Sequence, residues 1–329
     1  MPSCVNNIIY FRVFGMIMAN QSYGKYQIMT RISTLLTFFA LTSCNNPIAE
    51  EKAGFKDGKE IVISPTKNKI HELPPELNEI SGITFLNDSV LVAIQDEEGI
   101  LYYYNLPQNR IIKKQTFAGS GDYEDLVKVG KDMYVITSEG ILSQIKNFES
   151  TNPILKTIVT PFTKKNDIEG MTYDSKKQKL LIAPKEHGLD QNKTVKQIYG
   201  FDLRTMEFQV EPVYSIRLEE IESQFQGDAL EESSKKFLKA IGNQNMNKVF
   251  RSSAITIKES TGEIFVLSSL NGLILILNPS GILSKIIQFS GAEYKQPEGI
   301  AFSPDGKLYI SNEGGKSGIG NIIELTHEN

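Results

Sequence analysis

The sequence has little cysteine, little histidine and no surplus of positive charge. Among its 329 residues are two cysteines, Cys4 and Cys44, and three histidines. Two cysteines cannot form a disulfide framework in the body of a fold, and they exclude a multi-cysteine zinc site. A bound metal would therefore have to be held by oxygen atoms or by the histidines.

Sequence patterns for common catalytic chemistry are also missing. We find no Ser-His-Asp arrangement, no nucleophile motif and no glycine-rich phosphate loop. His71 and His187 stand in no recognisable ligand spacing, so we expect them to be surface or packing residues. These absences favour a binding function over catalysis.

The apolar run near the N-terminus is too short to cross a bilayer, which takes about 20 residues. It extends from Leu35 to Leu41, follows Arg31 and leads into Cys44, as is typical of a signal peptide. The segment "LTSC", which ends at Cys44, resembles the bacterial lipobox, in which the cysteine is lipidated and starts the mature chain. An ordinary cleaved signal with an incidental cysteine is the alternative. The residues before Met29 make the signal long, so a translation start at Met29 is also considered.

This interpretation divides the chain into a signal peptide over residues 1–43, a lipidated tether over 44–60 and a folded domain over 61–329. It locates the protein in the bacterial cell envelope, lipid-anchored to a membrane, which is the outer membrane in a Gram-negative cell. Without residues 1–43 the chain has 32 basic and 39 acidic residues. This negative balance gives no electrostatic support for nucleic-acid binding. We expect a monomer.

The rest of the chain is built from a repeat. Five segments align on one position at spacings of 43, 45, 84 and 45 residues, and that position holds Gly82, Asp125, Gly170, Ala254 and Gly299. Each segment is followed by turns and further runs rich in β-branched and aromatic residues. Repeats of about 40 to 50 residues with four strands each indicate an all-β fold, a β-propeller of four-stranded antiparallel blades.

The repeat count predicts five blades, with six as the alternative because one spacing is nearly doubled. The second half of that spacing, about residues 217–250, lacks strand alternation and has apolar residues at helical intervals, so we expect a helical insertion there. The last repeat runs out of chain after three strands. We expect an N-terminal strand, Lys69 to Leu73, to supply the fourth and close the ring.

Acidic residues recur where the first strand of each repeat begins. In a propeller these strands line the central channel, and residues two apart point to the same side. One register holds Ser81, Glu124, Glu169, Ser253 and Glu298, and the positions two residues earlier hold Glu79, Asp122, Asp167, Arg251 and Gln296. A further set follows the second strands and is expected at the channel mouth, with Asp96 or Glu97, Glu139, Lys185, Glu186 and Glu313.

Carboxylates this close repel one another, so they must take up protons, pair with a cation such as Arg251, or bind a metal. Calcium suits them, because it accepts about six to eight oxygen ligands in flexible geometry. Asp122 and Asp167 are candidate ligands beside the glutamates. The alternative is structural, since acids next to glycine can cap turns or hydrogen-bond neighbouring blades.

A calcium-dependent hydrolase of the phosphoesterase type is the alternative function, in which the metal positions phosphate and activates water. Such a site needs several Lys or Arg residues beside the acids. Lys185 and Arg251 are the evident cations at this mouth, so we favour a module that binds a ligand or partner.

The ordered segments "ELNEISGITF", "GDYEDLV", "NDIEGMTYD", "FRSSAITI" and "QPEGIAFSPDGKLYISNEGG" resemble the SdiA-regulated family of bacterial β-propellers. The resemblance covers roughly residues 69–325. It implies a cell-envelope protein with a metal, expected to be calcium, in the channel of a propeller, and it implies the ligands Glu79, Glu124, Glu169 and Glu298. The fourth repeat departs from the acidic pattern at Ser252, Ser253 and Ala254, so the site is expected to be lopsided. The resemblance implies no particular activity.

Overall fold

The computed structural model describes residues 61–63, 68–224, 245–289, 291–315 and 318–325. The predicted signal peptide and tether, with Cys44, lie outside the described residues. Within the described part of the chain, no helix is both long enough and apolar enough to cross a membrane.

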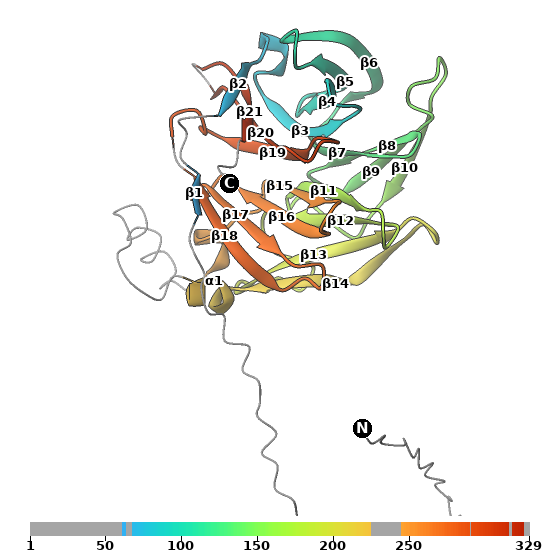
Figure 1. Cartoon of the computed structure of the whole chain (residues 1–329). Helices are drawn as coiled ribbons and strands as arrows, with labels where there is room; N and C mark the ends of the chain where they lie inside the picture. Colours follow the sequence, from blue (N-terminus) through green and yellow to red (C-terminus); the bar gives the residue numbers. More distant parts are fainter. Residues whose placement is uncertain (1–60, 64–67, 225–244, 290, 316–317, 326–329) are drawn as a thin grey trace, which may run out of the picture. The chain divides into compact units, whose positions relative to one another are not determined.

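Five blades of four strands each form a β-propeller (Figure 1), so the predicted fold and blade number are confirmed. Blade one contains β3 (Ile80–Phe85), β4 (Val90–Gln95), β5 (Glu98–Asn105) and β6 (Arg110–Ser120). Blade two contains β7 (Tyr123–Val129), β8 (Asp132–Thr137), β9 (Ile141–Lys146) and β10 (Ile154–Val159). Blade three contains β11 (Ile168–Asp174), β12 (Lys179–Pro184), β13 (Val195–Asp202) and β14 (Glu207–Arg217).

Blade four contains β15 (Ala254–Lys258), β16 (Glu263–Ser268), β17 (Leu273–Leu277) and β18 (Leu283–Phe289). Blade five contains β19 (Pro297–Phe302), β20 (Leu308–Asn312), β21 (Asn321–Leu325) and β2 (Lys69–Glu72). The strand β2 pairs antiparallel with β21, with Ile70 opposite Ile323. The predicted closure of the ring by an N-terminal strand is therefore confirmed.

A short strand that the sequence analysis did not predict extends blade four. The strand β1 (Ile61–Ile63) pairs in parallel with β18, with Ile61 opposite Ile287. The strand β1 is the first element among the described residues.

The hydrophobic core lies between the blades. In the described residues, buried apolar side chains form five clusters, and each cluster joins two neighbouring blades. The middle strand β17 is buried at all five positions, whereas the outer strand β10 is exposed at five of its six positions. Each sheet is covered on both faces by its neighbours, which explains the nearly continuous apolar runs in the middle strands.

The predicted insertion between blades three and four is helical at both of its described ends. The helix α1 (Leu218–Gln224) begins directly after β14, and the 3-10 helix η3 (Met246–Lys248) precedes β15. Leu218 and Met246 are buried in the cluster between these two blades. The central part of the insertion, residues 225–244, lies outside the described residues. A second 3-10 helix, η2 (Pro75–Leu77), connects β2 to β3.

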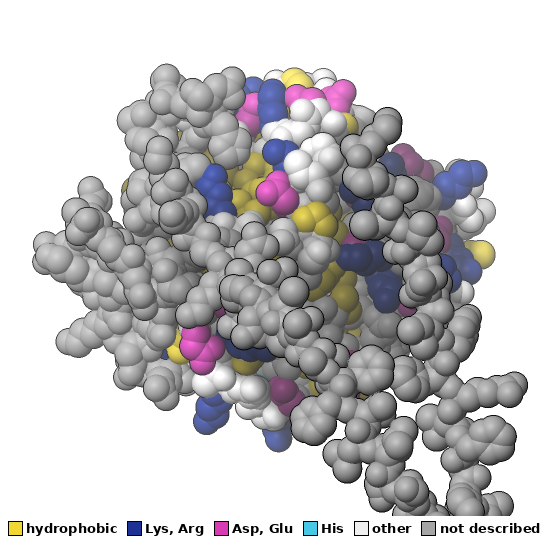
Figure 2. Space-filling model, turned by 60° about the horizontal axis from the view of Figure 1, so that its bottom comes forward, with side chains coloured by type: hydrophobic (Ala, Val, Ile, Leu, Met, Phe, Trp, Pro, Cys, Tyr) yellow, Lys and Arg dark blue, Asp and Glu magenta, His cyan; other side chains and the backbone are white. Residues whose placement is uncertain are grey.

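The surface carries charges of both signs. Figure 2 shows one face on which, in the part drawn in colour, Lys and Arg side chains are interspersed with Asp and Glu side chains. The concentrated negative charge of the molecule is found instead at one end of the central channel.

Candidate functional site

The channel glutamates are placed by β-bulges in the inner strands. The pairing of the first strand with the second shifts by one residue between Tyr123 and Asp125 in β7, and equivalent shifts flank Glu169 in β11 and Glu298 in β19. The residue inside each of these shifts is Glu124, Glu169 or Glu298. A bulge leaves one residue out of the ladder and turns its side chain to a new direction. One repeated backbone feature therefore brings three glutamates to the same end of the channel.

Blade four lacks this feature. The strand β15 pairs with β16 without a shift from Ala254 to Lys258, and the backbone N–H of Ser253 adds a further bond to Leu267. Ser253 is buried and its hydroxyl donates to the carbonyl of Pro297, over 2.8 Å. The fourth inner strand thus has neither the bulge nor the acid.

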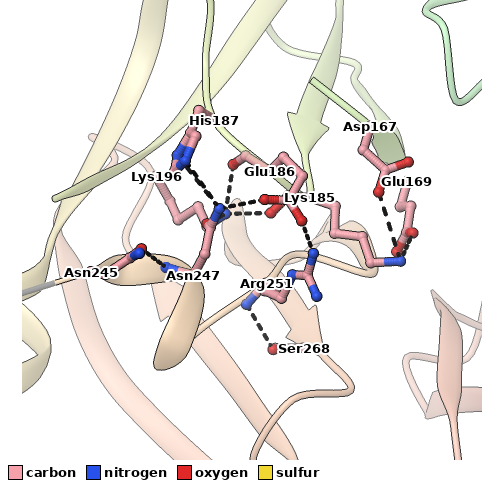
Figure 3. A network of polar contacts seen from close by, with 10 residues as sticks. All are labelled: Asp167, Glu169, Lys185, Glu186, His187, Lys196, Asn245, Asn247, Arg251 and Ser268. Carbon is pink, nitrogen blue, oxygen red and sulfur yellow. Dashed lines mark hydrogen bonds and ion pairs between the residues drawn. The ribbon is translucent and has the colours of Figure 1, made fainter. Parts of the chain in front are cut away.

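A lysine lies among the bulge glutamates. Lys185 follows β12, and its ammonium group donates a hydrogen bond to Glu169 and lies 3.9 Å from the Asp167 carboxylate (Figure 3). The backbone N–H of Lys185 donates to the carbonyl of Asp167, over 2.7 Å, which fixes the start of this loop. Burial alone would lower the pKa of Lys185, but the carboxylates of Glu169, Glu298 and Asp167 raise it.

The acids around Lys185 outnumber it. Burial, followed by the charges of Glu169 and Asp122, raises the pKa of Glu124 to about 10. Burial and the charge of Glu169 also raise the pKa of Glu298. Burial and the charges of Glu79 and Asp96 raise the pKa of Glu313 to about 7. Burial is the largest cause of each shift, and the surplus of carboxyl groups over cations at the entrance adds to it.

Two buried carboxylate oxygens at the entrance have no hydrogen-bond partner within the described residues. They are Oε2 of Glu169 and Oδ1 of Asp96. Glu169 is only 6% exposed, and its other oxygen accepts the Lys185 ammonium group. A buried acceptor without a partner costs about 1–3 kcal/mol and is rare in native proteins. Both oxygens are therefore free to accept a ligand.

A second network holds the loop beside the glutamates in place. The carboxylate of Glu186 pairs with the Arg251 guanidinium group and accepts a bond from Nδ2 of Asn247, over 2.6 Å (Figure 3). Lys196 is 2% exposed and donates to the backbone carbonyls of Lys185 and Glu186 and to Oδ1 of Asn247. Burial lowers the pKa of Lys196 to about 7, whereas its three acceptors match the three protons of the ammonium form. Arg251 and Glu186 thus neutralise each other and position Lys185.

The other predicted site residues lie farther from this centre. Glu79 is exposed and accepts a bond from Nδ2 of Asn78, over 3.0 Å, although its charge still raises the pKa of Glu313. Asp122 is exposed and accepts the hydroxyl of Ser138. The structure does not bring Glu139 into the cluster, because its carboxylate pairs with Lys164 at 2.9 Å in a separate pocket.

Three residues have supporting roles around the channel that were not assigned to them from the sequence. No sequence pattern pointed to Lys196 or Asn247, since Lys196 lies within a strand and Asn247 lies in the insertion. A pattern did point to Asp125, because it occupies a position that is glycine or alanine in the other four repeats. The histidines do not join the acids: Nδ1 of His71 bonds to Asn109 at 2.7 Å, and His187 lies beside Asn247.

In the described part of the chain, no group of three or more His, Cys, Asp or Glu residues is arranged as a metal site as it stands. The predicted calcium site accordingly stays a prediction. The structure itself defines a class of protein, a five-bladed β-propeller with an acid-lined channel entrance.

The comparison with family models agrees with this class. The model of the SdiA-regulated family matches residues 60–315, and the chain belongs to this family. A search of curated proteins found no significant match.

Solved structures share the fold at low sequence identity. Glutaminyl cyclase from Myxococcus xanthus has a TM-score of 0.50 and 13% identity, with 79% of this chain and 96% of that chain covered. A luciferin-regenerating enzyme has a TM-score of 0.45 and 13% identity, with coverages of 79% and 96%. Virginiamycin B lyase from Staphylococcus aureus has a TM-score of 0.41 and 14% identity, with coverages of 80% and 75%. The likeness to glutaminyl cyclase concerns the fold alone and carries no activity over to this chain.

Proposed function

We propose that the protein is a lipid-anchored protein of the cell envelope whose propeller binds a calcium ion at the channel entrance and there holds a ligand or partner. The observation that carries this proposal is the convergence of the three bulge glutamates on one end of the channel, where Glu169 keeps a buried oxygen without a partner. The envelope location rests on the lipobox-like segment that ends at Cys44.

The residues at the entrance fit calcium in their chemistry. The donors are all carboxylate oxygens, which suit a hard cation with flexible coordination. Glu124, Glu169, Glu298 and Glu313 are the residues that would hold the ion. Their raised pKa values support the proposal, because a divalent cation would favour the ionised form of each group. When bound, calcium would supply positive charge for an oxygen-bearing ligand at the mouth.

Lys185 supplies the positive charge in the metal-free protein. Its ammonium group bonds to Glu169, and its pKa is raised by the same carboxylates that would hold the metal. A divalent ion and this ammonium group repel each other, so we expect Lys185 to compete with calcium and to set the affinity of the site.

The arrangement of cations supports binding rather than phosphoester hydrolysis. Arg251 is engaged by Glu186, Lys185 by Glu169, and Lys196 is buried against backbone carbonyls. Of these three cations only Arg251 keeps a buried donor, its Nε, without a partner in the described residues, whereas a phosphoesterase needs several free cationic groups to hold its substrate and stabilise the developing charge.

The proposal is tested by thermal melting and calcium calorimetry on wild type and on Glu124→Gln. At neutral pH the pKa of Glu124, about 10, keeps this group protonated in the metal-free protein, so glutamine is a close mimic of that state. We expect wild type to gain about 2.7 kcal/mol of stability at a hundredfold excess of calcium over its dissociation constant. Glu124→Gln should melt like wild type in chelator and should lose most of the gain in calcium.

Glu139→Gln is the matched control, because Glu139 pairs with Lys164 away from the cluster. Its calcium-dependent gain should equal that of wild type. A wild-type melting temperature that does not respond to calcium would remove the metal from the proposal, and an equal loss in both variants would show an effect of net charge alone.

A further inference from the structure

A cavity of about 430 Å³ opens at the other end of the central channel. All five inner strands line it, from Asp125 at its inner end to turn residues such as Gly130 and Gly306, which follow or connect the C-terminal ends of these strands. The bulge glutamates lie at the N-terminal ends of the same strands. The volume is in the range of small-molecule sites, which is about 300–1,000 Å³.

The inner end of the cavity is rigid. The Asp125 carboxylate accepts bonds from the backbone N–H groups of Leu126, over 2.8 Å, and Met171, over 2.7 Å. Each of its oxygens thus has a backbone donor. Asp125 is therefore part of the wall, and its charge is not offered to a ligand.

Two threonines line this cavity with hydroxyls that form no hydrogen bond to the described residues. Thr172 and Thr256 are 6% and 8% exposed, both line the cavity, and neither hydroxyl forms a hydrogen bond within the described residues. Thr84 lines the cavity at the equivalent position of blade one. Neither hydroxyl oxygen is among the fully buried atoms without a partner in the described residues, so water or a bound ligand in the cavity can supply the hydrogen bond.

The remaining wall is apolar and the rim is cationic. Met171, Ile255, Ile300 and Phe302 line the cavity, and water solvates such a surface poorly. Lys128 and Lys258 line it from blades two and four, and neither forms an ion pair within the part of the chain that the structure describes. Besides Asp125, the lining contains one acid, Glu259, which accepts the hydroxyl of Ser175, over 2.8 Å.

We propose that this cavity is a second binding site, for a small amphipathic carboxylate. The apolar body would lie against the isoleucines and Phe302, and the carboxylate would lie between Lys128 and Lys258. A polar atom within the body, or a water molecule carried with it, would pair with the hydroxyls of Thr172 and Thr256. The site is independent of the calcium proposed for the opposite end of the channel.

The test uses octanoate as the probe and octylammonium as its partner of opposite charge, measured by titration calorimetry on the full protein. We expect octanoate to bind with a stoichiometry of one and to bind at least about tenfold more tightly than octylammonium. The double variant Lys128→Gln, Lys258→Gln should lose at least about tenfold in octanoate affinity, because both cationic groups are gone. Removing calcium with a chelator should leave octanoate binding unchanged.

Lys146→Gln is the control for the loss of positive charge, since Lys146 is an exposed residue of β9 outside the cavity. It should bind octanoate like wild type. Thr256→Leu, which adds apolar bulk in place of a hydroxyl, should abolish binding while thermal melting shows that the variant is folded. Absence of octanoate binding at millimolar concentration, equal binding of octylammonium, or unchanged binding by the double variant would each overturn the proposal.

Discussion

The carboxylate of Asp125 in blade two accepts a hydrogen bond from the backbone N–H of Met171 in blade three, over 2.7 Å. On its other side Asp125 abuts Gly82 of blade one, where an added Cβ would collide with the carboxylate and come within 2.8 Å of the Asp125 Cα atom. Burial raises the pKa of Asp125, and this effect outweighs the hydrogen bonds from the backbone N–H groups of Met171 and Leu126, which lower it. The side chain of Asp125 in blade two thus contacts both blade one and blade three. Residue 82 has to be glycine, because a Cβ atom at that position would overlap with Asp125.

We expect Asp125→Ala to lower the free energy of unfolding by about 1–3 kcal/mol, because the Met171 N–H loses its acceptor in a buried place. Urea unfolding monitored by circular dichroism measures this change. Asp88→Ala, at an exposed turn, should change stability by less than about 0.5 kcal/mol. If the two variants unfold at the same urea concentration, the bond between blades contributes nothing.

Glu313 should govern part of the pH dependence of the metal-free protein. Its pKa of about 7 lies above that of an unfolded glutamate, about 4.3, so the folded state holds the proton more tightly. The stability that this provides is fully present below the unfolded pKa and is lost as the pH rises through 7. In chelator, Glu313→Gln should melt close to wild type near pH 5 and above it near pH 8.5.

Comparing the two proteins cancels the titration of residues that Glu313 does not influence, Lys196 among them, so the difference reports Glu313 together with Glu298, whose pKa the charge of Glu313 raises. Differential scanning calorimetry across this pH range gives the two curves. A gap between them that is constant with pH would show that Glu313 does not titrate in this window.

Lys185→Gln should lower the stability of the metal-free protein and raise its affinity for calcium. In chelator the variant should be less stable, because Glu169 is left buried without its cation, and breaking a buried pair costs about 3–5 kcal/mol. In calcium calorimetry the variant should bind at least about tenfold more tightly, since a competing positive charge has been removed. Weaker calcium binding by Lys185→Gln would show that the lysine assists the metal instead of competing with it.

Removal of the closing strand should destabilise the ring. A protein without residues 1–60 should melt like the full chain, whereas a protein without residues 1–75 lacks β2 and leaves the edge of β21 unpaired. A protein without residues 1–67 keeps β2 and loses β1, so it separates the two contributions. Equal melting temperatures for the shortest and longest of these proteins would refute a stabilising role for the closure.

The membrane anchor is predicted to depend on Cys44. In Cys44→Ala the protein should leave the membrane fraction or accumulate as an unprocessed precursor, because the lipidated residue is missing. Fractionation and metabolic labelling with palmitate measure this outcome. Cys4→Ala should behave like wild type, and unchanged labelling of Cys44→Ala would exclude the proposed lipidation.

The fold was largely predictable from the sequence because its regularity is local. The spacing of Gly82, Asp125, Gly170, Ala254 and Gly299 marks the five inner strands, and alternation marks the strands that follow. Blade closure was predictable because the last repeat lacks a strand that the N-terminal segment can supply. The parallel pairing of β1 with β18 was not predictable, because a strand of three residues is too short for its hydrophobic pattern to indicate which strand it pairs with.

The candidate site was predictable in its acids and in the cations Lys185 and Arg251, but not in the residues that hold the loop of Lys185 in place. Glu124, Glu169 and Glu298 recur at one position of the repeat, so their convergence follows from the ring. The bulges that aim them are a backbone feature that residue types alone do not specify. Lys196 reaches this region from the middle of β13 and Asn247 from the insertion, so only the folded chain shows that both secure the loop of Lys185.

The pairing of β2 with β21 has a consequence for how the protein is made. Ile70 is among the first residues of the domain to be synthesised, and its partner Ile323 is among the last. Contacts between such distant parts of a chain form slowly, because a long loop must close before they are made. The first four blades can assemble in order as the chain emerges, while the β2 segment waits unpaired. Folding of the ring is therefore completed only when the last strand of the chain meets one of the first.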